Sequence, residues 1–280
     1  MTGQDLSGLR ARYARELLAS ARTRHGRVEA AFAAVARERH LTPPPWRIFA
    51  PGGFMDDETS DPAKLYDDVL VVLDCGKGIN NGQPSLHAAW MAALDPRPGE
   101  RIVQIGIGAG YYTAILAELV GDGGRVEAYE IEPRLAAIAR DNLGPLSQVT
   151  VHAASGVGAP LPEADVVYVS AAAAAPDPGW LRCLRPGGRL IFPWQPDPGH
   201  GIAAVVTRSP AGFGVELLSG VAFVACVGAP SGGAQPNRRR SAETRSIWLT
   251  DEAPPDETAT GIYEEVWFSS RQLSADRQSG

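Results

Sequence analysis

The stretch Arg101-Ile-Val-Gln-Ile-Gly-Ile-Gly-Ala-Gly110 decides the fold. A run of mostly β-branched apolar residues, typical of a buried strand, enters three closely spaced glycines, and residues 111–120 follow with apolar side chains at helical spacing. A strand, a glycine turn and a helix start in this order can hold a nucleotide. Glycines let the backbone approach a ligand closely, and the first N–H groups of a helix lack partners within it.

The spacing of the glycines narrows the ligand. Gly106, Gly108 and Gly110 are evenly spaced, whereas the dinucleotide fingerprint G-x-G-x-x-G places its third glycine three positions after the second. The lysine of a phosphate-binding P-loop is also absent from this stretch. The pattern favours an adenosine-containing ligand other than a dinucleotide, and a tight turn without a ligand is the alternative.

Composition and charge exclude several classes of protein. The chain of 280 residues carries a net charge of −6, which disfavours general nucleic-acid binding. Cys75, Cys183 and Cys226 lie far apart and without metal-ligand spacing, so neither a metal site nor a disulfide framework is expected. No signal-like or membrane-spanning apolar run occurs. We expect a cytoplasmic protein that binds neither membrane nor nucleic acid, with a monomer favoured.

Strand and helix patterns alternate after the glycine turn. Strands are predicted at 101–105, 125–130, 148–152, 165–170, 188–193, 202–208 and 215–226, and helices at 111–120, 133–142 and 177–184. This alternation predicts the α/β class, with a doubly wound, mostly parallel, seven-stranded Rossmann-like sheet. No helix separates the last two strands, so we expect them to pair antiparallel at one edge.

Three regions are expected along the chain. Residues 1–45 form an N-terminal helical cap, with helices at 5–24 and 28–38. Residues 46–229 form the α/β domain, and its substrate loop at 74–84 is followed by a helix that Ser85 caps. Residues 51–65 read as a loop and 69–73 as a strand. Residues 230–280 form a linker and a C-terminal extension, in which 247–249 and 262–268 could form a hairpin.

The ends of the predicted strands supply candidate ligand contacts. Glu130 ends the second strand, 24 positions beyond Gly106, where a carboxylate can accept hydrogen bonds from ribose hydroxyls. Ser155 and Gly156 follow the third strand and are small enough to leave room for an adenine ring. A surface glutamate and simple close packing are the alternative interpretations.

With these residues assembled, the chain resembles the class I S-adenosylmethionine-dependent methyltransferases, and most closely the protein-L-isoaspartate O-methyltransferases. Val103-Gln-Ile-Gly-Ile-Gly-Ala-Gly-Tyr111, Tyr129-Glu-Ile-Glu-Pro-Arg-Leu135 and the Leu-x-Pro-Gly-Gly-Arg-Leu turn at 184–190 carry the resemblance. It implies S-adenosyl-L-methionine as cofactor. The residues that it implies for cofactor binding are Gln104, Gly106, Gly108, Gly110, Tyr111, Glu130, Ile131, Ser155 and Gly156.

The chain departs from this family where the substrate is expected. The family's loop reads Gly-x-Thr-Ile-Ser-x-Pro, and its serine lies at the substrate carboxylate. Aligning Gln83-Pro84 with that pattern places Gly82 at the serine, with Asn80 and Asn81 in place of Thr and Ile. The resemblance therefore implies a substrate-carboxylate loop of Asn80, Asn81, Gly82 and Gln83 without a classical base.

Two departures concern the cofactor. The family's Asp-Gly after the third strand is Ser155-Gly156 here, and the acidic residue before its glycine motif is Gln104. Ser155 still offers a hydroxyl but no charge, so a lower cofactor affinity is expected. Gln104 keeps the shape of the acidic residue and loses its charge.

The leading hypothesis is a carboxyl O-methyltransferase for an isoaspartyl or aspartyl side chain of a protein or peptide, in repair or in peptide modification. An ionised carboxylate, with its ordinary pKa near 4, needs no base, and alignment with the methyl group is what the enzyme must supply. The acceptor could be a dedicated partner peptide. The alternatives are a non-catalytic adenosyl-binding or interaction protein and a small-molecule or nucleic-acid methyltransferase.

Overall fold

The computed structural model describes residues 6–49, 57–197, 199–230 and 241–273 of the chain. These residues form two compact units, 1–154 and 155–280, which are described separately below. The glycine turn and the loop that precedes it both belong to the first unit.

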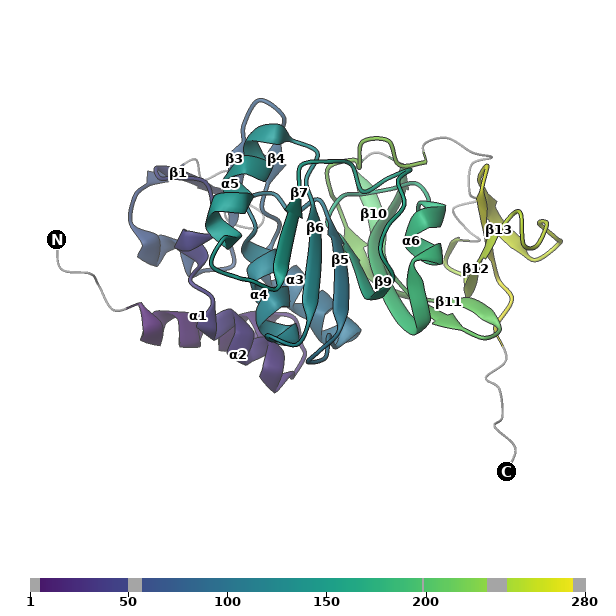
Figure 1. Cartoon of the computed structure of the whole chain (residues 1–280), viewed down its shortest axis with the longest axis horizontal. Helices are drawn as coiled ribbons and strands as arrows, with labels where there is room; N and C mark the ends of the chain where they lie inside the picture. The colour runs from purple at the N-terminus through teal and green to yellow at the C-terminus, as the bar shows by residue number, and fades with distance from the viewer. Residues whose placement is uncertain (1–5, 50–56, 198, 231–240, 274–280) are drawn as a thin grey trace. The chain divides into compact units, whose positions relative to one another are not determined.

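A parallel three-stranded arrangement forms the centre of the first unit. Strand β5 (Arg101–Ile105) pairs with β6 (Arg125–Tyr129), and β6 pairs with β7 (Val149–His152). Helices α4 (Tyr111–Val120) and α5 (Pro133–Leu143) connect consecutive strands, as Figure 1 shows. Because parallel strands share one carboxyl edge, the residues that follow β5 and β6 lie close together.

Two N-terminal helices pack against this unit. Helix α1 (Ser7–Ser20) lies beside α2 (Gly26–Ala34), below α3 (Pro84–Leu94) and α4 in the view of Figure 1. Phe32 of α2 is fully buried, and its ring centroid lies 6.3 Å from that of Tyr111. Two helices were expected here, but α2 ends four residues early, because Val35 is extended and residues 37–39 form a 3-10 turn.

A small antiparallel sheet precedes the parallel strands. Its order is β2 (Asp57–Thr59), β1 (Trp46–Phe49), β3 (Leu70–Asp74) and β4 (Ile79–Asn80). The expected loop at 51–65 therefore contains a strand and a 3-10 turn, Pro62–Leu65, although residues 50–56 lie outside the described part of the chain. Trp46 packs with Val71 and Leu73 in one apolar cluster.

Helix α3 (Pro84–Leu94) joins the small sheet to β5. It begins two residues earlier than expected, and its N-cap residue is Gln83, not Ser85. Proline at the first helical position has its φ already set for a helix, and Ser85 turns its hydroxyl to another partner.

The second unit contains a longer sheet with the order β13-β14-β12-β11-β10-β9-β8. Its elements are β8 (Ala164–Val169), α6 (Pro178–Arg182), β9 (Leu184–Asp197), β10 (His200–Ser209), β11 (Gly212–Val221), β12 (Ser246–Leu249), β13 (Ala259–Ile262) and β14 (Val266–Ser269). Strands β8 and β9 are parallel, and the other neighbours are antiparallel.

Three details of the second unit differ from the expectation. Strands β10 and β11 pair antiparallel as predicted, but β11 does not form the edge, because β12 pairs with it. Residues 262–268 are not one strand, since Tyr263 N donates to Val266 O (2.9 Å) and closes a turn between β13 and β14. The seven strands predicted between residues 101 and 226 correspond to β5 to β11, and β12, β13 and β14 follow them in the chain.

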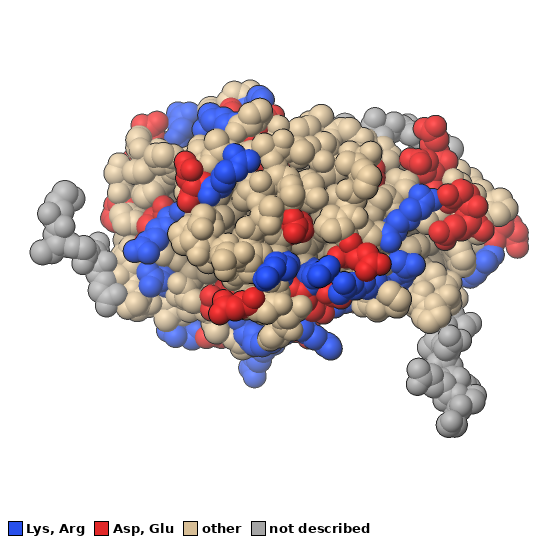
Figure 2. Space-filling view, viewed as in Figure 1, with Lys and Arg blue, Asp and Glu red and all other residues tan. Residues whose placement is uncertain are grey.

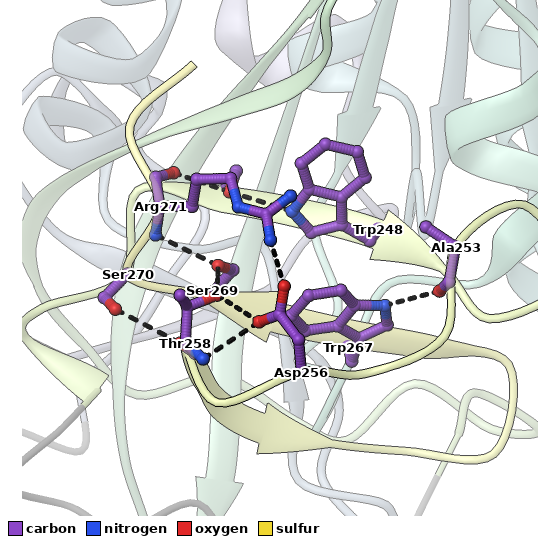
Figure 3. Close-up of polar contacts among 9 residues, drawn as sticks. Trp248, Ala253, Asp256, Thr258, Trp267, Ser269, Ser270 and Arg271 are labelled. Carbon is purple, nitrogen blue, oxygen red and sulfur yellow. Dashed lines mark hydrogen bonds and ion pairs between the residues drawn. The ribbon is translucent and has the colours of Figure 1, made fainter.

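A polar network fixes the loop before β13 (Figure 3). The Asp256 carboxylate accepts hydrogen bonds from the backbone N–H (2.9 Å) and the hydroxyl (2.5 Å) of Thr258, and it pairs with Arg271. These contacts lower the pKa of Asp256, with the Thr258 hydrogen bond as the first cause. The Arg271 guanidinium also lies 5.3 Å from the Trp248 ring. The network ties together segments on both sides of β13 and β14.

Charged side chains are interspersed on the face shown in Figure 2, where acidic and basic groups lie next to one another. Within the described ranges, no helix is both long and apolar enough to cross a membrane.

Candidate functional site

The glycine turn adopts a backbone that side chains rarely tolerate. Gly106, Gly108 and Gly110 have φ values of 77°, 58° and 101°. The turn is tied back to the sheet, because Gly106 N donates to Tyr129 O (2.9 Å). Helix α4 then begins directly after Gly110. The three predicted glycines are therefore brought together at the carboxyl edge of β5.

The carboxylate of Glu130 holds this turn from the neighbouring strand. Its Oε2 accepts a hydrogen bond from Gly108 N (2.7 Å), and its Oε1 accepts one from Glu132 N (3.0 Å). Glu130 is 6% exposed, and burial raises its pKa against the opposing effect of these backbone donors. Each carboxylate oxygen has lone pairs beyond the bond that it already accepts, so the carboxylate can also accept hydrogen bonds from a ligand's hydroxyl groups.

Gln104 and Ile131 also lie at this edge. Gln104 is 1% exposed, and its Oε1 has no hydrogen-bond partner among the described residues. A buried acceptor without a partner is costly, so this oxygen is suited to a ligand that donates a hydrogen bond. Ile131 is 43% exposed immediately after Glu130, which gives an apolar surface for a flat ring.

Tyr111 lies differently from the other predicted cofactor residues. Its side chain is 2% exposed and packs inward, 5.4 Å from the Arg37 guanidinium. Burial raises the pKa of its hydroxyl well above the ordinary value. Any contact of Tyr111 with a ligand at the turn would therefore come from its backbone at the start of α4.

Ser155 and Gly156 begin the second unit and form a local turn there. The Ser155 hydroxyl accepts a hydrogen bond from Val157 N (3.1 Å), and Gly156 O accepts one from Trp180 Nε1 (2.8 Å). Trp180 is fully buried, so the tryptophan anchors this turn. Both hydrogen bonds therefore have their two partners within the second unit.

Residues 78–84, which we call the acceptor loop after the role that the family resemblance implies, contain Asn80, Asn81 and Gln83, whose side chains all bond to other groups of the protein. Asn80 Oδ1 accepts from Gly82 N (2.8 Å), and Asn81 Oδ1 accepts from Val71 N (2.8 Å). Asn81 thereby extends the pairing of the small sheet. Asn80 is exposed, so its side chain lies at the surface of this loop.

The carboxylate of Asp68 fixes the end of the acceptor loop. Its Oδ1 accepts from Ser85 N (2.8 Å), while its Oδ2 accepts from the Ser85 hydroxyl (2.7 Å) and from Gln83 Nε2 (2.8 Å). The carboxylate thus caps the start of α3 from outside the helix. Gln83 is consequently engaged in shaping the loop, which was not expected from the sequence.

An aromatic pair lies beneath the acceptor loop. The rings of His87 and Tyr112 stack at 3.7 Å between centroids and 11° between planes. The Tyr112 hydroxyl donates to Gly82 O (3.1 Å). Burial, with Arg37 as a second cause, lowers the pKa of His87 to about 3, so the imidazole is neutral at physiological pH.

Sequence reasoning missed Asp68, His87 and Tyr112. Asp68 lies 15–17 positions from its partners Gln83 and Ser85, a separation without a periodic signal. A histidine on an otherwise apolar helix was the only available sign of His87. In the described ranges, no group of three or more His, Cys, Asp or Glu side chains could hold a metal ion, and none of the three cysteines is in a disulfide.

The fold and this edge define a class of protein. A glycine turn after a parallel strand, held by a carboxylate from the next strand, is the adenosyl-binding arrangement of a Rossmann-like α/β fold. The profile of the Protein-L-isoaspartate(D-aspartate) O-methyltransferase family matches residues 53–231. The chain therefore belongs to this family and is a methyltransferase, with S-adenosylmethionine as the family's methyl donor.

Individual relatives agree with the family match. The chain is 32% identical over 163 residues to the Protein-L-isoaspartate O-methyltransferase of Ignicoccus hospitalis, covering 57% of this chain and 76% of that one. It is 33% identical to Protein-L-isoaspartate O-methyltransferase 2 of Anaeromyxobacter sp., covering 77% and 82%. A crystal structure of a β-aspartate methyltransferase from Plasmodium falciparum, in complex with S-adenosyl-L-homocysteine, shares the fold with a TM-score of 0.63 at 18% identity. That match covers 78% of this chain and 97% of the other.

The residues of the first unit fit this cofactor. The ribose hydroxyls would be held by Glu130, the adenine ring would pack on Ile131, and Gln104 Oε1 would accept from the amino group of the donor. The bound cofactor supplies an electrophilic methyl group on sulfur. The part of these residues would be to bind the cofactor and to orient its methyl group.

Proposed function

We propose that this chain transfers a methyl group from S-adenosylmethionine to a carboxylate oxygen of an isoaspartyl or aspartyl side chain in a protein or peptide. The carboxylate oxygen forms the new bond to the methyl carbon, the carbon–sulfur bond breaks, and its electron pair stays on sulfur. The products are a methyl ester and S-adenosylhomocysteine. No proton moves, so no base is needed.

One observation carries the proposal. Within the first unit, the Tyr112 hydroxyl joins the acceptor loop directly to the helix that begins at the glycine turn. The loop and the turn are therefore held in one fixed relation, which an in-line displacement requires. The proposed cofactor contacts within the first unit are those at Gln104, the glycine turn, Glu130 and Ile131.

The test is methyl transfer to matched synthetic peptides. Peptides that differ only in one residue, isoaspartyl, aspartyl or asparaginyl, are incubated with labelled S-adenosylmethionine and analysed by mass spectrometry. We expect one added methyl on a carboxyl-bearing peptide and none on the asparaginyl peptide. S-adenosylhomocysteine binding without methylation of either carboxyl peptide would contradict the proposal.

A second candidate concerns the range of acceptors. The glycine at position 82 and the internal use of Gln83 motivate an acceptor loop adapted to one dedicated partner peptide, methylated to drive aspartimide formation. Such an enzyme would leave unrelated isoaspartyl peptides unmodified. Efficient turnover of isoaspartyl peptides of arbitrary sequence would therefore rule this candidate out.

A further inference from the structure

Gly82 lies at the Nε2 edge of the His87 ring. Its φ is 76°, and a Cβ built there would overlap Nε2 of His87 and lie 3.0 Å from Cδ2. A side chain at position 82 would therefore point into the imidazole instead of toward an acceptor. His87 is 1% exposed, so the ring has little room to retreat.

Both peptide groups of Gly82 are held as well. Its N–H donates to Asn80 Oδ1 (2.8 Å), and its carbonyl accepts from the Tyr112 hydroxyl (3.1 Å). The His87 ring stacks on Tyr112, which keeps the phenol aligned with that carbonyl. The imidazole thus fills the space beside Gly82 and, through Tyr112, supports the Gly82 carbonyl.

We propose that His87 is a positioning residue of the acceptor loop, which fixes the left-handed backbone at Gly82 and, through Tyr112, links this loop to the glycine turn. The inference rests on the proposed function, which identifies the loop as the acceptor site. In this proposal the residues at positions 82 and 87 depend on each other. The glycine that stands where the family pattern has serine therefore belongs with His87 in a loop of different construction. Restoring the serine alone would damage the loop.

The chain offers a matched control for backbone strain. Gly78 also has a positive φ of 65°, but a Cβ there would meet nothing within 4 Å. Alanine at either position carries the strain of a left-handed backbone, and only alanine at 82 collides with His87. The difference between Gly82→Ala and Gly78→Ala therefore isolates the contact with the ring.

The experiment is a double-mutant cycle with Gly82→Ala, His87→Ala and the combined variant, beside Gly78→Ala and Tyr112→Phe. Each protein is assayed for melting temperature, for S-adenosylhomocysteine affinity by calorimetry, and for KM and kcat with a carboxyl-bearing peptide. We expect Gly82→Ala to lose about tenfold more acceptor kcat/KM than Gly78→Ala, mainly through KM, with cofactor affinity nearly unchanged. The combined variant should recover part of this loss, because the alanine fills space that the ring has left. Tyr112→Phe should raise the acceptor KM in the same direction and by less.

Two outcomes would overturn the inference. One is equal behaviour of Gly82→Ala and Gly78→Ala, and the other is a combined variant as poor as the sum of the single changes. If the wild-type protein methylates no carboxyl peptide, the proposed function fails separately. The melting temperatures of the same cycle then decide whether His87 fixes the loop.

Discussion

Two carboxylates organise two loops of the first unit, and they do so in different ways. Glu130 holds the glycine turn through the backbone N–H of Gly108, and its other oxygen accepts from the backbone N–H of Glu132. Asp68 holds the acceptor loop mostly through side chains, those of Gln83 and Ser85. Backbone donors persist whatever the side chains are, whereas side-chain donors change with the sequence. A turn held by backbone can stay recognisable while a loop held by side chains diverges.

The largest effect is expected when the cofactor turn loses its carboxylate. Glu130→Ala removes two charge-assisted hydrogen bonds to the backbone and the expected ribose contact, so affinity for S-adenosylhomocysteine should fall by about 3 kcal/mol. Calorimetry measures this change. Glu118→Ala, on the exposed face of α4, is the control and should stay within about 0.5 kcal/mol. An unchanged affinity in Glu130→Ala would remove the carboxylate from the cofactor site.

For Asp68, the other carboxylate, we expect the reverse: the change should affect peptide binding more than cofactor binding. Asp68→Asn weakens the bonds to Ser85 and Gln83, so the peptide KM should rise about tenfold while cofactor affinity changes little. Steady-state kinetics and calorimetry on the same sample separate the two quantities. Asp67→Asn is the neighbouring control with an exposed side chain. Equal loss of cofactor and peptide binding would show that the two loops do not behave separately.

Acid should destabilise the first unit through His87. Its pKa falls from 6.5 in the unfolded chain to about 3 in the folded protein, so between these values the unfolded state binds the extra proton. The contribution of the neutral His87 to the free energy of unfolding is complete above pH 6.5. It decreases by about 1.4 kcal/mol per pH unit as the pH falls from there toward 3. Denaturant unfolding at several pH values gives the slope. His87→Gln should show a shallower one, and equal slopes would contradict the buried, neutral imidazole.

Sequence-based predictions were most accurate where a periodic pattern of apolar residues or a required glycine conformation determines the local structure. The periodic runs that form β5, α4 and α5 were predicted with nearly correct bounds, and the three glycines and Glu130 meet at one edge. The family resemblance is confirmed by the matched profile. These features depend on periodicity and on glycine conformations, which a single sequence displays.

The acceptor loop could not be predicted in the same way. Whether Gln83 faces the substrate or Asp68 depends on how β3 and α3 pack, which sequence separation does not show. Tyr111 was expected at the cofactor because it follows the glycines, but its side chain is drawn into the core by Phe32 and Arg37. The strands β12 to β14 also gave weak signals, because each has only four residues.

Arg37 has a consequence for any shortened form of the protein. It is fully buried, and its guanidinium donates to Leu65 O (2.6 Å), Asp67 O (3.2 Å) and Val69 O (2.7 Å), on both sides of Asp68. The family profile begins only at residue 53. A fragment trimmed to the matched range would leave these three carbonyls without their donor, at the segment that presents Asp68 to the acceptor loop. We therefore expect a stable shortened form of the protein to need Arg37, which lies outside the matched range.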